Sequence, residues 1–360
     1  MNEAGILLGA LAAGWIITSL LVPLIARLCL RRGWLDRPGP RKLHVRPTPR
    51  LTGIALFPSI WGPLLIASWL VPSHAAEFLP SALPVIAGAV LILGLGIIDD
   101  LRPLSGAVKL CSEAIVGTLL YGVGIGFDRL WIPFVGGITL GVLSWPVSLL
   151  WFLLLLNAVN IIDGMDGLAV STTAVASVTL IWVSWTHHLL IIAVGASALL
   201  GGLIAFWRHN RPPAKVFMGD SGTLTVGYFI AVVALLVPIK RFTVVAFFVP
   251  VLALLLPLAE AVVTLGRRSL SRVNPLGADA DHIHHRLLKR GWSPRRILLT
   301  YNALAVVLGA FCVALRYVNR RVLAVVLGFF VLSLLATLAI ILHSRTEGTA
   351  AYRHRADDEG

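Results

Sequence analysis

Two adjacent carboxylates, Asp99 and Asp100, stand where a long apolar run of the chain ends. At a membrane boundary, neighbouring carboxylates repel each other unless a cation or a proton lies close to them. A plain helix end explains the pair less well, because the C-terminal end of a helix already carries partial negative charge. The two residues therefore indicate a metal site, a proton acceptor or both.

A second polar group ends a later apolar run, with the sequence Asn157-Ala-Val-Asn160-Ile-Ile-Asp163-Gly-Met-Asp166-Gly. Asn157 and Asn160 are three residues apart and share one helix face, which Asp163 continues if the helix persists. These side chains, with glycines that allow close backbone approach, could hold a hard cation or a phosphate. A turn built from Asp-Gly pairs is the alternative, but it does not need two asparagines on the preceding membrane helix.

A third group lies at residues 210–222 and leads into another apolar run. It contains Asn210 and Phe217 and ends in Met-Gly-Asp-Ser-Gly. Asp220 and Ser221 can cap the following helix, whose exposed N–H groups form a natural site for an anion. Capping alone is a real alternative for this segment.

A fourth group, Asp279-Ala-Asp-His282-Ile-His284-His285-Arg286, is rich in imidazoles. These side chains could bind a phosphate or a zinc ion. Zinc is the weaker choice, because closely spaced histidines without cysteine partners resemble no closed structural zinc site. A solvated basic helix start is the remaining alternative.

The elements that must position these groups are membrane helices. Hydrophobic residues make up 58% of the chain and charged residues 13%, which no soluble globular domain could accommodate. A helix needs about 20 apolar residues to cross the hydrocarbon core, and about 11 runs of this kind occur. We therefore predict an all-α polytopic membrane domain over residues 1–343 and a short polar cytoplasmic tail over 344–360. The expected spans are 6–30, 53–72, 82–98, 107–125, 138–160, 167–185, 188–206, 222–238, 242–265, 297–315 and 322–343.

The basic residues predict how these helices are oriented. Residues 6–30 are followed rather than preceded by arginines, so we expect an uncleaved helix with its N-terminus outside. Most Lys and Arg residues lie in alternate connections and in the tail, which the positive-inside rule places in the cytoplasm. This topology puts all four polar groups on the cytoplasmic face. The net charge of +13 then suits anionic lipids and phosphorylated substrates. Because the basic residues are divided among short loops, we expect no nucleic-acid partner.

From about Arg41 to Leu288 the chain resembles the polyprenyl-phosphate N-acetylhexosamine-1-phosphate transferases. This membrane family, glycosyltransferase family 4, contains the WecA, TagO and MraY types. The resemblance rests on the four groups above and on Arg41-Lys-Leu-His-Val-Arg-Pro-Thr-Pro-Arg50, in the family's order and with similar spacing. The His-Ile-His-His sequence at 282–285 is similar to the WecA and TagO types, whereas the MraY type usually has three consecutive histidines.

The resemblance implies transfer of N-acetylhexosamine-1-phosphate, with N-acetylglucosamine the expected sugar, from a UDP-sugar to undecaprenyl phosphate. UMP leaves, and the lipid diphosphate sugar begins a cell-surface polysaccharide at the inner membrane of a bacterial cell. Two anionic phosphates must approach each other, so a divalent cation is expected, Mg²⁺ with Mn²⁺ as the alternative. Membrane lipid is a further partner. A homodimer is left open, as are direct against two-step transfer and other acetamido sugars.

The resemblance also assigns roles to individual residues. Asp220 is the expected metal ligand, followed by Asn160. Asp163 and Asp166 would organise this site, and Asp166 and Phe217 would lie near the uracil. The carboxylates of Asp99 and Asp100 would lie beside the lipid phosphate as a base, a positioning group or a metal-related group. The catalytic candidates are Asp99, Asp100, Asp163, His282, His284 and His285. The substrate-binding candidates are Lys42, His44, Arg46, Asn157, Asp166, Asn210, Phe217 and Arg286.

Two alternative functions compete with this reading. The first, within the same family, is MraY-type transfer of a phospho-muropeptide, which the His-Ile-His-His sequence disfavours. The second is an ion-coupled transporter, which would also keep acidic residues in membrane helices. Transporters usually place such residues at the midplane of the membrane, whereas here they stand at the ends of the spans.

Overall fold

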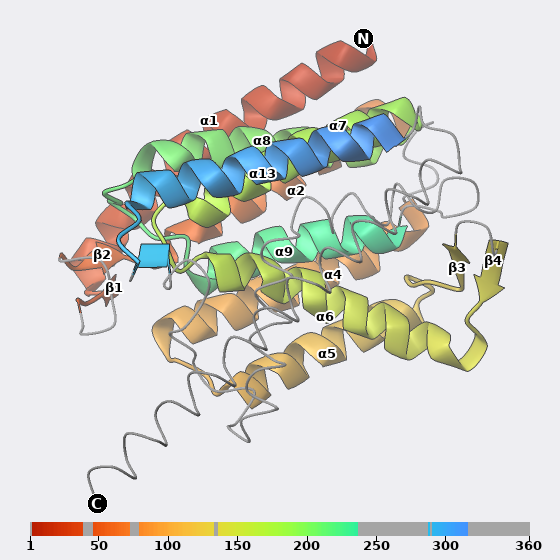
Figure 1. The fold of residues 1–360 in the computed structure, drawn as a ribbon, viewed down its shortest axis with the longest axis horizontal. Helices are drawn as coiled ribbons and strands as arrows, with labels where there is room; N and C mark the ends of the chain where they lie inside the picture. Colours follow the sequence, from red (N-terminus) through yellow and green to blue (C-terminus); the bar gives the residue numbers. More distant parts are fainter. Residues whose placement is uncertain are drawn as a thin grey trace, which may run out of the picture. The chain divides into compact units, whose positions relative to one another are not determined.

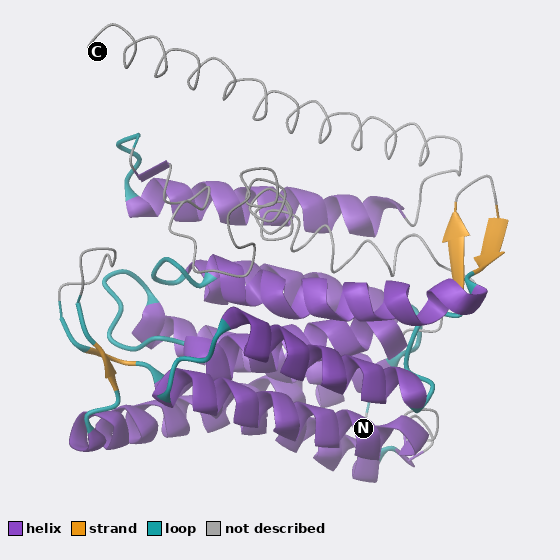
Figure 2. Ribbon diagram, turned by 90° about the horizontal axis from the view of Figure 1, so that it is seen from below, coloured by secondary structure: helices purple, strands orange, loops and turns teal. Residues whose placement is uncertain are grey.

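The computed structural model of the protein describes residues 2–38, 46–72, 79–132, 136–236, 287–288 and 290–315, and these residues are mainly helical (Figures 1 and 2). Residues 1–313 form one compact unit, and of the second, 314–360, only the end of a helix is described. The helices are α1 Glu3–Arg32, α2 Leu56–Leu70, α4 Leu79–Leu101, α5 Gly106–Gly122, α6 Ser144–Ile162, α7 Leu168–Thr186, α8 Leu190–Asn210, α9 Gly219–Leu236 and α13 Pro294–Leu315.

Short elements join these helices. The 3₁₀ helices η1 (Leu51–Ala55) and η2 (Gly141–Leu143) lead into α2 and α6. Strands β1 (Leu35–Asp36) and β2 (Thr48–Pro49) pair antiparallel, with Leu35 opposite Pro49. Strands β3 (Arg129–Ile132) and β4 (Gly136–Thr139) form a second antiparallel pair.

Seven helical segments in the described part of the chain are long and apolar enough to cross a membrane. They are Glu3–Arg32, Leu51–Leu70, Ser81–Leu101, Gly141–Ile162, Leu168–Thr186, Leu190–Asn210 and Gly219–Leu236. This result confirms a helical protein with several apolar spans.

Four of the predicted spans are not among these seven segments. The runs predicted at 107–125 and 297–315 do form helices, α5 and α13. The runs at 242–265 and 322–343 lie outside the described residues, as does the tail from 344. The number of spans, their orientation and the boundary at residue 343 therefore stay predictions.

Small residues allow the helices to approach closely, which is how membrane helices commonly pack. In the contact between α1 and α8, Gly14 lies against the backbone of Ala198, and Gly201 lies against the backbone of Leu11. A side chain at either glycine would collide with main-chain atoms that cannot move aside. Figure 1 shows these two helices, far apart in sequence, side by side, and their close approach depends on the two glycines.

Helix α9 is buried along nearly its whole length and contacts α4, α6, α2 and η1. Its Tyr228 side chain is fully buried, and its hydroxyl donates a hydrogen bond to the carbonyl oxygen of Val85 in α4 at 2.7 Å. At the start of α9, Gly53 and Gly96 pack against the backbone around Met218 to Gly222. This packing brings the end of α4 and the beginning of η1 next to Asp220.

Candidate active site

The first turn of α9 is capped by a carboxylate from another helix. Asp100, at the end of α4, accepts hydrogen bonds from the backbone N–H of Asp220 at 2.9 Å and of Ser221 at 3.0 Å. The Nε atom of Arg50 lies 2.9 Å from one of the same oxygens, and the Asp100 side chain is fully buried. Negative charge at a helix N-terminus is favourable. The Asp100 carboxylate therefore stabilises the contact of α4 and Arg50 with the first turn of α9.

Asp99, its neighbour, has a different environment. One oxygen accepts the N–H of Leu104 at 2.7 Å, and the other lies 3.5 Å from Nζ of Lys109. Lys109 is on α5, and its ammonium lies 2.7 Å from Oδ2 of Asp220. One ammonium therefore bridges Asp99 and Asp220, two of the predicted site residues from separate helices.

Asp220 lies at the centre of the site and contacts residues from several elements. Besides Lys109, it contacts Nδ2 of Asn160, which donates to Oδ1 at 3.0 Å, and the Arg50 guanidinium at 4.0 Å. The two predicted metal ligands, Asp220 and Asn160, are thus brought into direct contact. The ends of α4 and α6 and the start of α9 converge here, and each of them carries one of the three polar groups named from the sequence.

The donor set fits a magnesium ion. Carboxylate and amide oxygens are hard ligands, and Mg²⁺ is often held by only one or two carboxylates together with water and substrate phosphates. Within the described ranges, no group of three His, Cys, Asp or Glu residues is placed to hold a metal by itself. Asn160 would present its amide oxygen to a metal after a flip of the side-chain amide, an orientation that is assigned from hydrogen bonds.

Asp163 follows the last residue of α6 and belongs to the same charged cluster. Burial raises the pKa of its carboxyl well above the ordinary value, the nearby Asp100 carboxylate raises it further, and Arg50 lowers it. Among the described residues of this cluster, four aspartates, Asp99, Asp100, Asp163 and Asp220, face two cations, Arg50 and Lys109. Such an excess of carboxylates favours the binding of further positive charge.

Asn157 lies one turn before Asn160 on α6 and meets an acidic residue of α5. Its Nδ2 donates to Oε2 of Glu113 at 2.6 Å and to the carbonyl oxygen of Leu153 at 3.0 Å. Glu113 is fully buried, and its other oxygen has no hydrogen-bond partner among the described residues. Glu113 stands four residues after Lys109, so one face of α5 presents both side chains to the site.

Asn210 and Asp166 hold together the two loops beside this cluster. Buried Asn210 accepts the N–H of Gly167 at 3.0 Å and donates to the carbonyl oxygen of Val216 at 2.9 Å. Asp166 accepts the N–H of Ala214 at 2.8 Å. Gly167 has φ +75° and packs against the Trp207 ring, so this position favours glycine. Through these hydrogen bonds, the side chains of Asn210 and Asp166 position the connection between α8 and α9, which contains Phe217.

Comparison with known proteins identifies the family. The model of glycosyl transferase family 4 matches residues 82–238. A decaprenyl-phosphate N-acetylglucosaminephosphotransferase of Mycobacterium tuberculosis (strain ATCC 25618 / H37Rv) is 32% identical over 362 residues, covering 93% of this chain and 89% of the relative. The chain belongs to glycosyltransferase family 4.

Other relatives are similar to this chain to comparable extents. A probable undecaprenyl-phosphate N-acetylglucosaminyl 1-phosphate transferase of Bacillus subtilis (strain 168) is 29% identical over 84% of this chain and 83% of its own. A phospho-N-acetylmuramoyl-pentapeptide-transferase of Shouchella clausii (strain KSM-K16) is 30% identical over 82% of this chain and 92% of its own. The chain is therefore similar to relatives with two different sugar donors.

The match to glycosyltransferase family 4 spans α4 to α9 and contains every site residue described above except Arg50. Sequence reasoning missed Arg50, Lys109 and Glu113, which contact predicted residues directly. Lys109 and Glu113 did carry a signal, because charged residues within an apolar run are rare unless they have a role. Arg50 is the last residue of the segment 41–50 that carries part of the family resemblance, but the sequence analysis gave it no role.

The remaining predicted site residues are Arg46, Phe217 and six residues outside the described ranges. Arg46 is exposed, and its carbonyl oxygen accepts the hydroxyl of Thr48 at 3.0 Å. Phe217 joins the site through its backbone, which donates to Pro49 at 2.8 Å and accepts from Thr52 at 2.6 Å. The others lie outside the described residues, namely Lys42, His44, His282, His284, His285 and Arg286.

Proposed function

We propose that the protein transfers N-acetylglucosamine-1-phosphate from UDP-N-acetylglucosamine to undecaprenyl phosphate, releasing UMP. The observation that carries this proposal is the convergence of Asp220, Asn160 and Lys109 at the ends of apolar helices. A lipid phosphate and a nucleotide diphosphate would meet at such a boundary. The names of the relatives support the same reaction.

In this reaction an oxygen of the lipid phosphate attacks the β-phosphorus of the UDP-sugar. A new P–O bond forms, the bond to the α-phosphate oxygen breaks, and UMP leaves with the bonding electrons. Mg²⁺, held by Asp220 and Asn160, would neutralise charge on the reacting phosphates. Lys109 lies between Asp99 and Asp220, so its ammonium is placed to bind a phosphate oxygen when substrates enter.

The two neighbouring aspartates would have separate tasks. Both oxygens of Asp100 are taken by backbone donors and Arg50, which leaves this residue as an anchor for α9. Asp99 has one oxygen whose only close contact among the described residues is Lys109 at 3.5 Å. Asp99 is therefore the better placed of the two to contact the lipid phosphate or to accept a proton.

We further propose that the site faces the cytoplasm of a bacterial cell from its inner membrane, because the predicted topology places the basic connections on that side. Magnesium, undecaprenyl as the lipid and the eleven-span arrangement belong to this proposal as well. Muropeptide transfer is the second candidate function, favoured by the similarity to the phospho-N-acetylmuramoyl-pentapeptide-transferase.

The test is transfer of radiolabel from UDP-N-acetylglucosamine to undecaprenyl phosphate by the purified protein, with and without magnesium. We expect labelled lipid only with the metal. Asp220→Ala should reduce transfer by at least about 100-fold, because it removes the central charged ligand. Asp128→Ala, at an exposed aspartate after α5, is the matched control and should retain activity.

Other donors complete the design. Transfer from UDP-N-acetylmuramoyl-pentapeptide but not from UDP-N-acetylglucosamine would establish the second candidate. If no UDP-acetamido sugar gave labelled lipid, the proposal that the protein is a transferase would be wrong. If Asp220→Asn kept exchange activity and stopped the uptake of a solute, a transporter would be the correct reading.

A further inference from the structure

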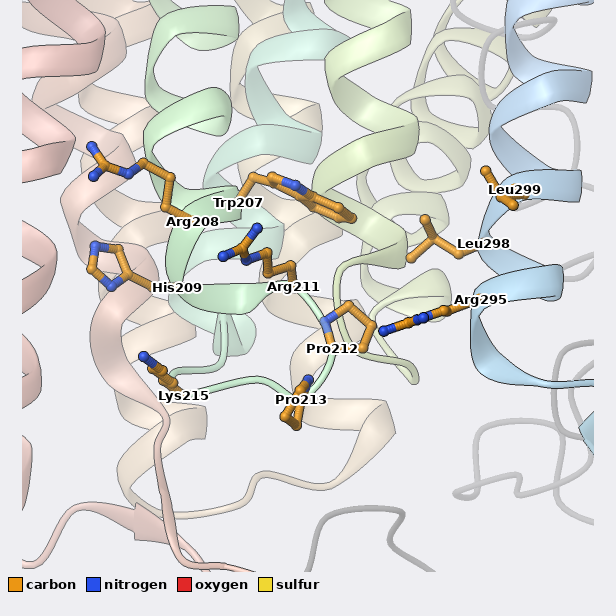
Figure 3. A pocket seen from close by; sticks show the side chains of 10 residues that line it. All are labelled: Trp207, Arg208, His209, Arg211, Pro212, Pro213, Lys215, Arg295, Leu298 and Leu299. Atoms are coloured by element: carbon orange, nitrogen blue, oxygen red, sulfur yellow. The ribbon is translucent and has the colours of Figure 1, made fainter.

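A second site of a different kind lies where the connection from α8 to α9 meets the beginning of α13. A cavity of about 510 Å³ opens there, and Figure 3 shows its lining. One wall is formed by Trp207 to His209, Arg211 to Pro213 and Lys215, and the other by Arg295, Leu298 and Leu299 of α13. None of the residues assigned to phosphate transfer above lines this cavity.

The lining is strongly basic. It contains Arg208, His209, Arg211, Lys215 and Arg295, and no Asp or Glu residue lines it in the described part of the chain. No ion pair joins these side chains to a described carboxylate. Cations gathered in one place repel each other, so the arrangement favours an anionic ligand that neutralises them.

The side chains reach the cavity from both walls. In Figure 3, Arg295 extends from α13 toward the turn at Pro212 and Pro213, and Arg211 projects from the same connection below Trp207. Arginine presents several N–H donors in a planar fork that matches phosphate oxygens. Arg295 therefore brings a phosphate-binding group to the cavity from α13, and Arg211 brings another from the connection.

The position of the cavity relates it to the lipid boundary. The apolar segment Leu190–Asn210 ends within its lining, at Trp207 to His209. Tryptophan is favoured at the boundary between hydrocarbon and water. Leu299 is 68% exposed beside the basic groups, which suits contact with an acyl chain rather than with water. A basic pocket between helices at this depth is the expected form of an anionic lipid headgroup site.

We propose that this cavity binds the phosphate headgroup of an anionic phospholipid, held chiefly by Arg211 and Arg295. The bound lipid links α13 to the connection that leads to Asp220. α13 also contacts the neighbouring connection between α6 and α7, because Ile297 and Tyr301 of α13 pack against Met165 and Leu168. This site does not rest on the proposed transfer reaction, since none of the residues assigned to that reaction lines it.

The experiment titrates the full-length protein, purified in an uncharged detergent, with short-chain phosphatidylglycerol and measures bound lipid by native mass spectrometry. The neutral control ligand is phosphatidylcholine with the same acyl chains. Replacing one basic residue near the surface lowers affinity for an anionic lipid by about fivefold. Arg211→Gln and Arg295→Gln should each show this loss, and the double variant should lose about 25-fold.

The matched control is Arg31→Gln with Arg32→Gln, an exposed arginine pair in the last turn of α1 that does not line the cavity. This variant should bind phosphatidylglycerol like the wild type. The single variants keep the test valid if the double variant fails to fold. The proposal fails if all variants bind equally, or if phosphatidylcholine binds as well as phosphatidylglycerol.

Two competitors separate other sources of a phosphate. Displacement of the lipid by inorganic phosphate at equal concentration would show a site for free phosphate and would overturn the lipid assignment. Displacement by UDP-N-acetylglucosamine would assign the cavity to the nucleotide substrate and would also overturn it. Because the readout is bound lipid, failure here leaves the transfer assay unaffected.

Discussion

At the scale of single residues, the adjacent aspartates show how surroundings divide the work of identical side chains. Asp100 is fully buried and its carboxylate is occupied by two backbone N–H groups and Arg50. One carboxylate oxygen of Asp99 accepts a hydrogen bond from the N–H of Leu104, and the other lies near the ammonium of Lys109. A residue that caps a helix cannot move toward a substrate without releasing the cap. The two aspartates should therefore contribute differently to the free energy of unfolding as well as to the reaction.

The first prediction at this scale concerns that asymmetry. Asp100→Ala should lower the free energy of unfolding by about 2 kcal/mol, because it removes the cap of α9. Asp99→Ala should change it by less than about 1 kcal/mol, because its loss leaves the helix cap intact. Thermal unfolding in detergent measures the difference, and both variants should lose transfer. Equal unfolding temperatures for the two variants would contradict the assignment of Asp100 as the anchor.

The second prediction concerns Lys109. Lys109→Met should reduce kcat/KM for transfer by about 100-fold or more, because it removes the cation between Asp99 and Asp220. Arg102→Met, at an exposed cation just after α4, is the control and should retain transfer. Steady-state assays at saturating magnesium measure both. Equal activity of the two variants would show that Lys109 only compensates charge in the folded protein.

At the scale of elements, apolar runs predicted the helices well because the thickness of the membrane sets their length. The runs at 6–30 and 188–206 became Glu3–Arg32 and Leu190–Asn210, with small shifts at the ends. Hydropathy carries no signal for the short pieces between them, so η1 and the strands β1 to β4 were not predicted. The pairs of helices in contact were also beyond reach, because they depend on tertiary packing.

The third prediction tests one of those contacts. Gly14→Leu should lower the free energy of unfolding by about 3 kcal/mol, because its side chain would meet the backbone of Ala198 on α8. Gly9→Leu, on the same helix, has open space around it and should unfold like the wild type. Unfolding in detergent measures both. If Gly9→Leu were equally destabilised, the loss of glycine in α1 itself, rather than the contact with α8, would be the cause.

The same distinction explains which site residues could be predicted. Asp99, Asp100, Asn160 and Asp220 carry polar groups at the ends of apolar runs, so the one-dimensional pattern revealed them. Their partners could not be assigned in this way. The contact between Lys109 and Asp220 joins residues 111 positions apart and exists only because α5 and α9 are folded against the same end of α4. A pattern along the chain cannot specify such a pair.

At the scale of the whole molecule, the charge distribution predicts which side of the membrane the site faces. The ends of α4 and α6 and the start of α9 meet at Asp220, so one orientation applies to all of them. Basic connections on this side should lie in the cytoplasm, and the connection between α5 and α6 should lie outside. The whole site therefore faces either the cytoplasm or the outside, and one measurement can distinguish the two orientations.

The final prediction tests it with two single cysteines in a variant whose three native cysteines are replaced by alanine. Ser105→Cys stands at the exposed start of α5 beside the site, and Asp128→Cys stands at an exposed position in the connection between α5 and α6. In intact bacterial cells, a membrane-impermeant maleimide should label Asp128→Cys, because that connection is expected to face outward. Ser105→Cys should react only after the membrane is opened. The reverse pattern would place the site on the outer face, away from any cytoplasmic nucleotide sugar, and would remove the proposed donor from reach.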